Sequence, residues 1–143
     1  MSTGTDFIRN WFAAFNRGDL EAMVAMCHTD VELSNSDGSY RGHDGVRAAF
    51  KPIIDSGTEW DTRVNNVIDA GDTVVAEFVL RGRHTKPLVT AQATIPPTNK
   101  MIDLPSIGVF ELRDGKLAAS RGAFDRMTLL VQLGLMPAPV AVR

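Results

Sequence analysis

The spacing of apolar residues changes along the chain, and this change is the strongest limit on its fold class. Near the N-terminus the spacing is that of one wide helical face, whose members are Phe7, Ile8, Trp11, Phe12 and Phe15. From Trp60 onward the period becomes two, as on strands with one buried face. Helices first and strands afterwards predict an α+β domain, with the helices packed on one face of a curved antiparallel sheet.

Helix boundaries are indicated by capping and stop residues. The first helix should end before Gly18, and Asp19 should cap a second helix that follows at once. A third helix is predicted over 44–51, and Pro52 should limit its continuation. A last helix is expected from Asp125 to about Leu133.

The strands are predicted from alternation between turn-rich segments. Their expected ranges are 31–34, a strand starting near 60, 73–83, 88–95, 101–112 and 117–124. Pro105 implies a sheet edge or a bulge, because proline has no N–H for a ladder bond. The segment Arg113-Asp114-Gly115-Lys116 is a strong hairpin signal.

Length and composition exclude several classes of protein. The 143 residues predict a single domain, 1–143, with an ordered core of about 5–135 and a loose C-terminal tail. No apolar run reaches the roughly 20 residues of a membrane span, and the lone Cys27 can form no internal disulfide. The net charge of -2 without a basic run argues against nucleic-acid binding. The N-terminus lacks the features of a secretion signal, so a cytoplasmic protein is expected.

Several segments together resemble a known superfamily. They are WFAAFNRGDL at 11–20, RGHDGVRAAF at 41–50, GRH at 82–84, PPT at 96–98, GVFELRDGK at 108–116 and LLVQLG at 129–134. Their order and spacing resemble the nuclear transport factor 2-like superfamily. Within it, they are most similar to the SnoaL-like polyketide cyclases and the related limonene-epoxide hydrolases. The resemblance covers almost the whole chain. It implies a cone-shaped sheet with N-terminal helices, an apolar pocket and a homodimer formed across the sheet. No cofactor is expected, and no metal site is expected because His28, His43 and His84 lack the i, i+4 spacing of a helix-borne metal site.

The acid and base residues of these relatives are absent from the matching positions. The Asp and His of SnoaL-type cyclases fall on Gly122 and Gly108. The Asp-Arg-Asp set of the epoxide hydrolases falls on Val89, Ala91 and Gly122, and the Tyr and two Asp of ketosteroid isomerases fall on Trp11, Asn35 and Gly108. A member of this family with a non-standard active site is therefore expected.

Asp103 and Asn35 are the candidate catalytic residues. A carboxylate among apolar neighbours at a cavity rim would have a raised pKa, and Asp103 follows Met101 and Ile102. Asn35 could orient a substrate oxygen, or it could be a turn residue. Asp125 is interpreted as a helix cap rather than a displaced carboxylate, and His84 as a structural hydrogen-bonding residue rather than a base.

The pocket is expected to be apolar with a few hydroxyl groups. Its predicted substrate-binding residues are Trp11, Phe15, Leu33, Trp60, Phe78, Ser106, Phe110, Ser120 and Phe124. Gly108 and Gly122 either enlarge this cavity or leave space that neighbouring side chains fill.

We interpret the chain as a SnoaL-like enzyme that binds a bulky apolar small molecule. The predicted reaction is a cofactor-free cyclisation or isomerisation of a polyketide or terpenoid-like intermediate, in which shaping of the substrate contributes most of the catalysis. Two alternatives stay open. One is a non-catalytic ligand-binding member of the same fold, and the other is an epoxide hydrolase with a relocated carboxylate.

Overall fold

The computed structural model describes residues 3–138, and within them it contains four helices and nine strands. The helices are α1 (Thr3–Asn16), α2 (Leu20–Ala25), α3 (Gly42–Asp55) and α4 (Arg126–Gln132). The strands are β1 (Cys27–Asn35), β2 (Gly38–Arg41), β3 (Gly57–Thr58), β4 (Arg63–Asp69), β5 (Thr73–His84), β6 (Leu88–Val89), β7 (Thr94–Ile95), β8 (Met101–Arg113) and β9 (Lys116–Phe124). Residues 139–143 of the predicted loose tail lie outside the described part of the chain.

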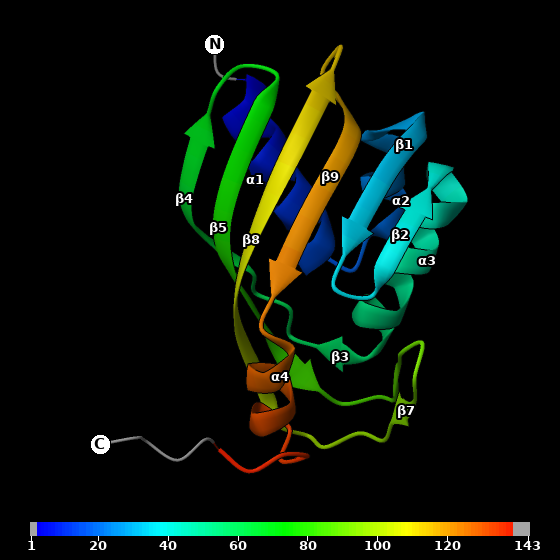
Figure 1. Cartoon of the computed structure of the whole chain (residues 1–143), viewed down its shortest axis with the longest axis vertical. Coiled ribbons are helices and arrows are strands. Elements are labelled where there is room, and N and C mark those ends of the chain that lie inside the picture. Colours follow the sequence, from blue (N-terminus) through cyan, green and yellow to red (C-terminus); the bar gives the residue numbers. More distant parts are fainter. Residues whose placement is uncertain (1–2, 139–143) are drawn as a thin grey trace.

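One curved, open sheet forms the main layer of the molecule. Its strand order is β2-β1-β9-β8-β5-β3, and β4 also pairs with β5. Helices α1, α2 and α3 lie on one side of this sheet, and α4 lies at the lower end of β9 (Figure 1). The α+β class with N-terminal helices on a curved sheet is therefore confirmed. Among the described helices, none is long and apolar enough to cross a membrane.

The sheet differs from the prediction in one pairing. Strand β1 runs parallel to β9, whereas the other pairs are antiparallel. The two strands are far apart in sequence, so no hairpin turn determines their relative direction. The expected all-antiparallel sheet is wrong at this pair.

The helix caps follow the prediction, but α3 is longer than expected. Gly18 has φ 70°, and Asp19 Oδ1 accepts a hydrogen bond from the amide of Ala22 at 3.1 Å. Pro52 does not end α3, which continues to Asp55. Proline gives up one helical hydrogen bond, while Ile53 and Ile54 beyond it pack against the core and stabilise the last turn.

Two strand predictions have different outcomes. Pro105 pairs with Val79 of β5, but the pairing of β8 with β9 reaches only Ser106, so Pro105 lies at a local edge as predicted. The single strand predicted over 88–95 is wrong, because β6 and β7 form a small separate hairpin. Between them, the Thr90 hydroxyl donates to the Ala93 carbonyl at 2.8 Å and closes a turn.

The turn between β8 and β9 sets the register that matters for the site. Asp114 and Gly115 have φ 53° and 77°, as a two-residue hairpin requires, which confirms the predicted turn. In this register Gly108 of β8 lies directly opposite Gly122 of β9.

The core lies between α1 and the inner face of the sheet. The Phe110 ring of β8 is its centre, with ring centroids 6.3 Å from Phe7, 6.3 Å from Trp11 and 6.4 Å from Phe12. Burial of each such side chain stabilises the fold by about 1.5–3 kcal/mol. These aromatic rings therefore fill the space between α1 and the part of β8 that lies near the β8–β9 turn.

Candidate functional site

A cavity of about 400 Å³ lies on the inner side of the sheet, toward its lower end. Helices α1 and α3 form one wall, strands β1, β5, β8 and β9 form the other, and α4 and the β6–β7 hairpin border the opening. Most of the lining is apolar and includes Trp11, Phe12, Phe15, Phe50, Ile53, Trp60, Phe78, Leu80, Leu88, Ile102, Leu104, Phe124 and Leu129. This volume is in the range of natural small-molecule sites.

Aromatic contacts hold the cavity walls in place. The rings of Phe12 and Phe78 lie 4.5 Å apart, and those of Phe15 and Trp60 lie 5.4 Å apart. The Trp60 indole Nε1 donates to the Ile54 carbonyl at 3.2 Å. A Cβ atom on Gly82 would lie 2.3 Å from the Trp60 ring, so this glycine provides the space for the indole. The shape of the cavity is therefore built into the fold.

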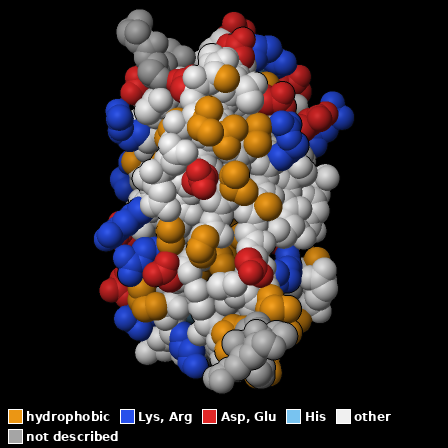
Figure 2. Space-filling view, turned by 60° about the vertical axis from the view of Figure 1, so that its left-hand side comes forward, with side chains coloured by type: hydrophobic (Ala, Val, Ile, Leu, Met, Phe, Trp, Pro, Cys, Tyr) orange, Lys and Arg blue, Asp and Glu red, His pale blue; other side chains and the backbone are white. Residues whose placement is uncertain are grey.

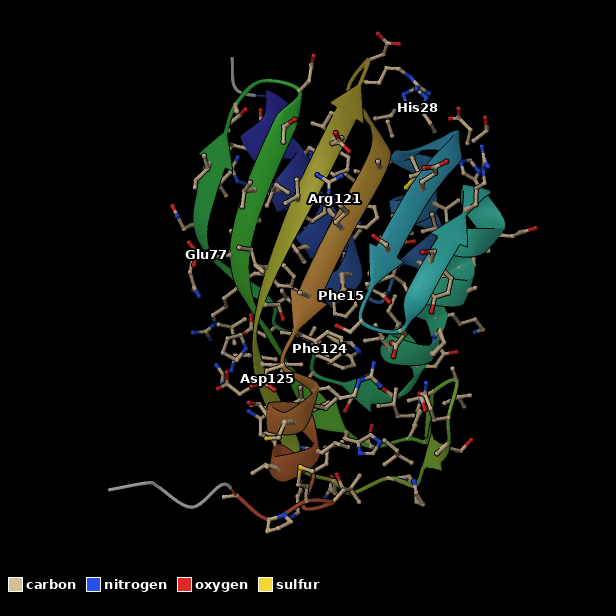
Figure 3. All side chains as sticks on the ribbon, in the orientation of Figure 1. Phe15, His28, Glu77, Arg121, Phe124 and Asp125 are labelled. Carbon is tan, nitrogen blue, oxygen red and sulfur yellow. The ribbon has the colours of Figure 1, made fainter. Side chains whose placement is uncertain are left out.

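Most of the side chains predicted to bind substrate do line this cavity. They are Trp11, Phe15, Leu33, Trp60, Phe78, Ser120 and Phe124. Figure 3 shows Phe15 behind the lower half of the sheet and Phe124 at the end of β9. Gly122 shares the face of Ser120 and Phe124, and a Cβ atom there would have only the Ile107 carbonyl oxygen nearby, at 3.8 Å. Gly122 therefore does enlarge the cavity.

Phe110 and Ser106 do not line the cavity, which corrects their expected position. Phe110 belongs to the packed core, and its ring covers Gly108 so closely that a Cβ atom on Gly108 would lie 2.9 Å from Phe110 Cε1. The Ser106 hydroxyl donates to the Leu104 carbonyl at 3.1 Å. The space left by Gly108 is therefore filled by a neighbouring ring.

Asp103 lies outside the cavity, and its expected place at the rim is corrected. Ile102 and Leu104 line the cavity, so strand alternation turns Asp103 to the outer face. Its side chain is 56% exposed, and its Oδ2 lies 3.5 Å from Nε of Arg81. A carboxylate in that position has no contact with a ligand in the cavity.

Asn35 lines the cavity, but its oxygen is already used in a turn. Oδ1 accepts from the amide of Asp37 at 2.8 Å and from the amide of Gly38 at 3.3 Å. This is the turn arrangement that Asn favours, and it connects β1 to β2. Asn35 therefore shapes the segment that carries Asp37.

Among the residues that the structure describes, the ionisable side chains of the cavity lining are Asp37, Tyr40 and Arg126, and the sequence analysis missed all three. Asp37 and Arg126 form a part-buried ion pair, with side chains 26% and 37% exposed. The Arg126 Cζ atom lies 5.8 Å from the centre of the Phe124 ring. Tyr40 of β2 lies opposite Leu33 of β1, a residue that faces the cavity. Proton transfer or charge recognition in the cavity would thus fall to these three side chains, whereas the other polar lining residues, such as Ser34 and Ser120, are neutral.

The other candidate groups have structural roles. Asp125 caps α4, and its hydrogen bonds from the Thr128 hydroxyl and amide lower the pKa of its carboxyl. His84 is buried, its Nδ1 accepts from the amide of Thr98 at 3.2 Å, and burial lowers its pKa. Burial raises the pKa of the Cys27 thiol to about 12, so it is no activated nucleophile. In the described part of the chain, no three His, Cys, Asp or Glu residues lie close enough to hold a metal ion.

Solved structures with this architecture agree with the fold over nearly their whole length. TsrD from Streptomyces laurentii is 24% identical, with a TM-score of 0.80 and coverage of 94% of this chain and 96% of that chain. A protein from Jannaschia sp. CCS1, provisionally named a SnoaL-like polyketide cyclase, is 19% identical, with a TM-score of 0.81 and coverage of 94% of both chains. TerC, co-crystallised with polyporic acid, is 19% identical, with a TM-score of 0.72 and coverage of 93% and 99%. These similarities show the fold.

Sequence comparison identifies the family. No curated protein matches the chain. The sequence profile of the SnoaL-like domain matches residues 8–120, which span α1 to β9 and thus most of the cavity walls. The chain therefore belongs to the SnoaL-like domain family of the nuclear transport factor 2-like superfamily.

Proposed function

We propose that this protein is a cofactor-free cyclase or isomerase that acts on a bulky apolar small molecule, such as a polyketide or terpenoid-like intermediate. The observation that carries the proposal is the aromatic-walled cavity of about 400 Å³, whose apolar lining is interrupted at one edge by Asp37, Tyr40 and Arg126. Such a cavity excludes water from a ring system while leaving one end of the substrate in contact with polar groups.

Shape is the main catalytic contribution in this proposal. A flexible chain held in a reactive geometry gains up to about 7–11 kcal/mol from proximity and orientation alone. The Tyr40 hydroxyl can donate a hydrogen bond to a substrate carbonyl, and the Asp37 carboxylate can accept a proton from an acidic carbon beside it. TerC, a structural neighbour, was crystallised with polyporic acid, and this ligand supports an organic small molecule as the class of substrate.

Two alternatives remain, each supported by one observation. Among residues 3–138, Asp37 is the only carboxylate that lines the cavity, and it is held in an ion pair, which favours a ligand-binding protein without catalysis. The same carboxylate is a candidate for the relocated acid of an epoxide hydrolase. Asp103 and the pair Gly108 and Gly122 offer no support for acid–base chemistry in the cavity.

Product mass separates these functions. The protein is incubated with polyketide and terpenoid intermediates, including epoxides, and the products are analysed by liquid chromatography and mass spectrometry. Cyclisation or isomerisation gives a new product of unchanged mass, epoxide hydrolysis adds the mass of one water, and a binding protein returns the substrate unaltered.

A variant in which a larger side chain fills part of the cavity shows whether the reaction takes place there. Gly122→Leu places a side chain in the open space beside β9, so turnover should be lost while the fold is kept. Tyr40→Phe and Asp37→Asn should lower turnover, whereas Asp103→Asn on the outer face should leave it unchanged. Full activity of Gly122→Leu would place the reaction elsewhere.

We also propose that the protein is cytoplasmic and that its whole chain forms one domain. Two copies of this domain are proposed to form a homodimer across the outer face of the sheet. Apolar side chains gather on one face of the molecule (Figure 2). Strand alternation places Val75 and Val79 of β5, both partly exposed, and Ile107 of β8, 46% exposed, on the outer face of the sheet. Exposed apolar patches of this kind mark association surfaces. Sedimentation analysis should give twice the chain mass for wild type and the single-chain mass for Ile107→Glu. A monomeric wild-type protein would contradict the dimer.

A further inference from the structure

One ion pair connects the two segments that border the cavity at its polar edge. Asp37 lies in the turn between β1 and β2, and Arg126 is the first residue of α4, 89 positions later. Arg126 Nη2 donates to Asp37 Oδ1, and both side chains line the cavity. Figure 1 shows the β1–β2 turn and α4 at the same, lower end of the sheet.

Arg126 keeps hydrogen-bonding capacity that the fold does not use. A guanidinium has five N–H donors in a planar fork, and in the described part of the chain Asp37 is its only hydrogen-bond partner. Its other close neighbour is the Phe124 ring, which holds the guanidinium beside the cavity and accepts no ordinary hydrogen bond. The free edge of the guanidinium is thus available to a ligand that enters along the aromatic walls.

The partner of Arg126 is easily exchanged. Both side chains of the pair are partly exposed, and ion pairs of this kind contribute little to stability. A carboxylate on a ligand reproduces the geometry of the Asp37 carboxylate and binds a guanidinium through two parallel hydrogen bonds. Arg126 can therefore turn from Asp37 to a ligand, or bind both, without breaking any element of the fold.

We propose that Arg126 is a recognition residue for a carboxylate, so that the substrate is an amphipathic acid: an apolar ring system inside the cavity and an anionic group at its edge. This inference rests on the proposed function, because it takes the same cavity as the substrate site. Asp37 is a competing anion in this arrangement and weakens the binding of the acid. Arg126 and Asp37 together thus determine that the anionic end of the substrate stays at the opening of the cavity.

The test uses two probes with the same ring system, anthracene-2-carboxylate and its uncharged methyl ester, titrated into the full-length protein by calorimetry. Wild type should bind the acid about tenfold more tightly than the ester, as expected for one charge-assisted contact. Arg126→Gln should remove this preference and leave ester binding unchanged, and Arg126→Lys should restore part of it. Asp37→Asn should tighten binding of the acid alone, up to about fivefold.

A matched control is Arg121→Gln. Arg121 lies on the outer face of β9, paired with Glu111 at 2.7 Å, and Figure 3 shows it in front of the sheet. This variant should bind both probes as wild type does. Unchanged affinity for the ester shows that a variant keeps its cavity intact. The variant Asp37→Asn tests the inference separately, because it leaves Arg126 unchanged.

The outcomes separate the inference from the function on which it rests. Equal binding of acid and ester by wild type, or a preference that survives Arg126→Gln, overturns the role of Arg126 while the apolar cavity stands. Failure of both probes to bind contradicts the ligand cavity, and the inference with it. Weaker binding of the acid by Asp37→Asn would show that Asp37 assists recognition, and would overturn the competition between the two anions.

Discussion

Two neighbouring glycines on the inner sheet face have opposite surroundings. At Gly108 of β8, on the side of the closed, packed end of the interior, the Phe110 ring fills the space of the missing side chain. At Gly122 of β9, on the side of the open end, no side chain fills it, and the cavity continues to Phe124 and Arg126. The two glycines are direct neighbours in the sheet register. The difference shows that the neighbouring rings, and not the glycines, decide where the interior is packed and where it is open.

The largest difference between the two ends of the interior is expected when one aromatic ring is truncated at each end and the free energy of unfolding is measured. Phe110→Ala should lower the free energy of unfolding by about 3–5 kcal/mol, because it removes the centre of the aromatic core. Phe124→Ala should cost less than about 1.5 kcal/mol, since that side chain is only partly buried, but it should weaken binding of the ester probe. Urea unfolding measures both values. Equal losses would mean that the open end is core rather than binding site.

Adding one methyl group at each glycine is a smaller test of the same difference. Gly108→Ala should destabilise the fold by about 1–3 kcal/mol, because the new Cβ atom would lie 2.9 Å from the Phe110 ring. Gly122→Ala should change stability by no more than about 0.5 kcal/mol, since it enters open space. Thermal unfolding of the two variants side by side provides the measurement, and a larger loss at Gly122 would reverse the assignment of the two ends.

Acid should destabilise the fold through His84, which is buried at the end of β5. Burial lowers the pKa of His84 below its ordinary value of 6.5, so the unfolded chain takes up a proton that the folded chain resists. Stability from this group is present above pH 6.5 and is lost as the pH falls below it, by at most about 1.4 kcal/mol per pH unit. Urea unfolding at pH 7.5 and 5.5 should show a loss in wild type that is smaller in His84→Gln. An equal loss in both proteins would remove His84 as its source.

The smallest effect is expected on the outer face. Asp103→Asn should change stability by less than about 0.5 kcal/mol and leave probe binding unaltered, because its carboxylate is exposed and contacts Arg81. The same calorimetric titration checks this. Weaker binding would show that the outer face is coupled to the cavity.

Local features of the fold could be predicted from the sequence, because a few neighbouring residues determine them. Asp19 and Asp125 cap the helices that follow them, and the Asp114-Gly115 turn has the positive φ values of a hairpin. The parallel pairing of β1 with β9 could not be predicted, since it depends on residues far apart in the chain. The passage of α3 through Pro52 depends on core contacts of Ile53 and Ile54.

The residues of the site show the same division between local features, which the sequence predicts, and contacts between distant segments, which it does not. Alternation along β9 correctly places Ser120 and Phe124 on the inner face. Counting in twos from Gly108 also places Leu104 inside and Asp103 outside, so this signal was present in the sequence. The pairing of Asp37 with Arg126 joins a turn to the start of a helix 89 residues away, and no local sequence pattern predicts it.

The most direct test of the cavity as the ligand site uses the two tryptophans of the chain, Trp11 and Trp60, which both line it. In a nitrogen-15 correlation spectrum each indole N–H gives one signal. Titration with the methyl ester of anthracene-2-carboxylate should shift both signals in wild type and neither in Gly122→Leu. Binding of the ester with both indole signals unmoved would contradict a ligand site in this cavity.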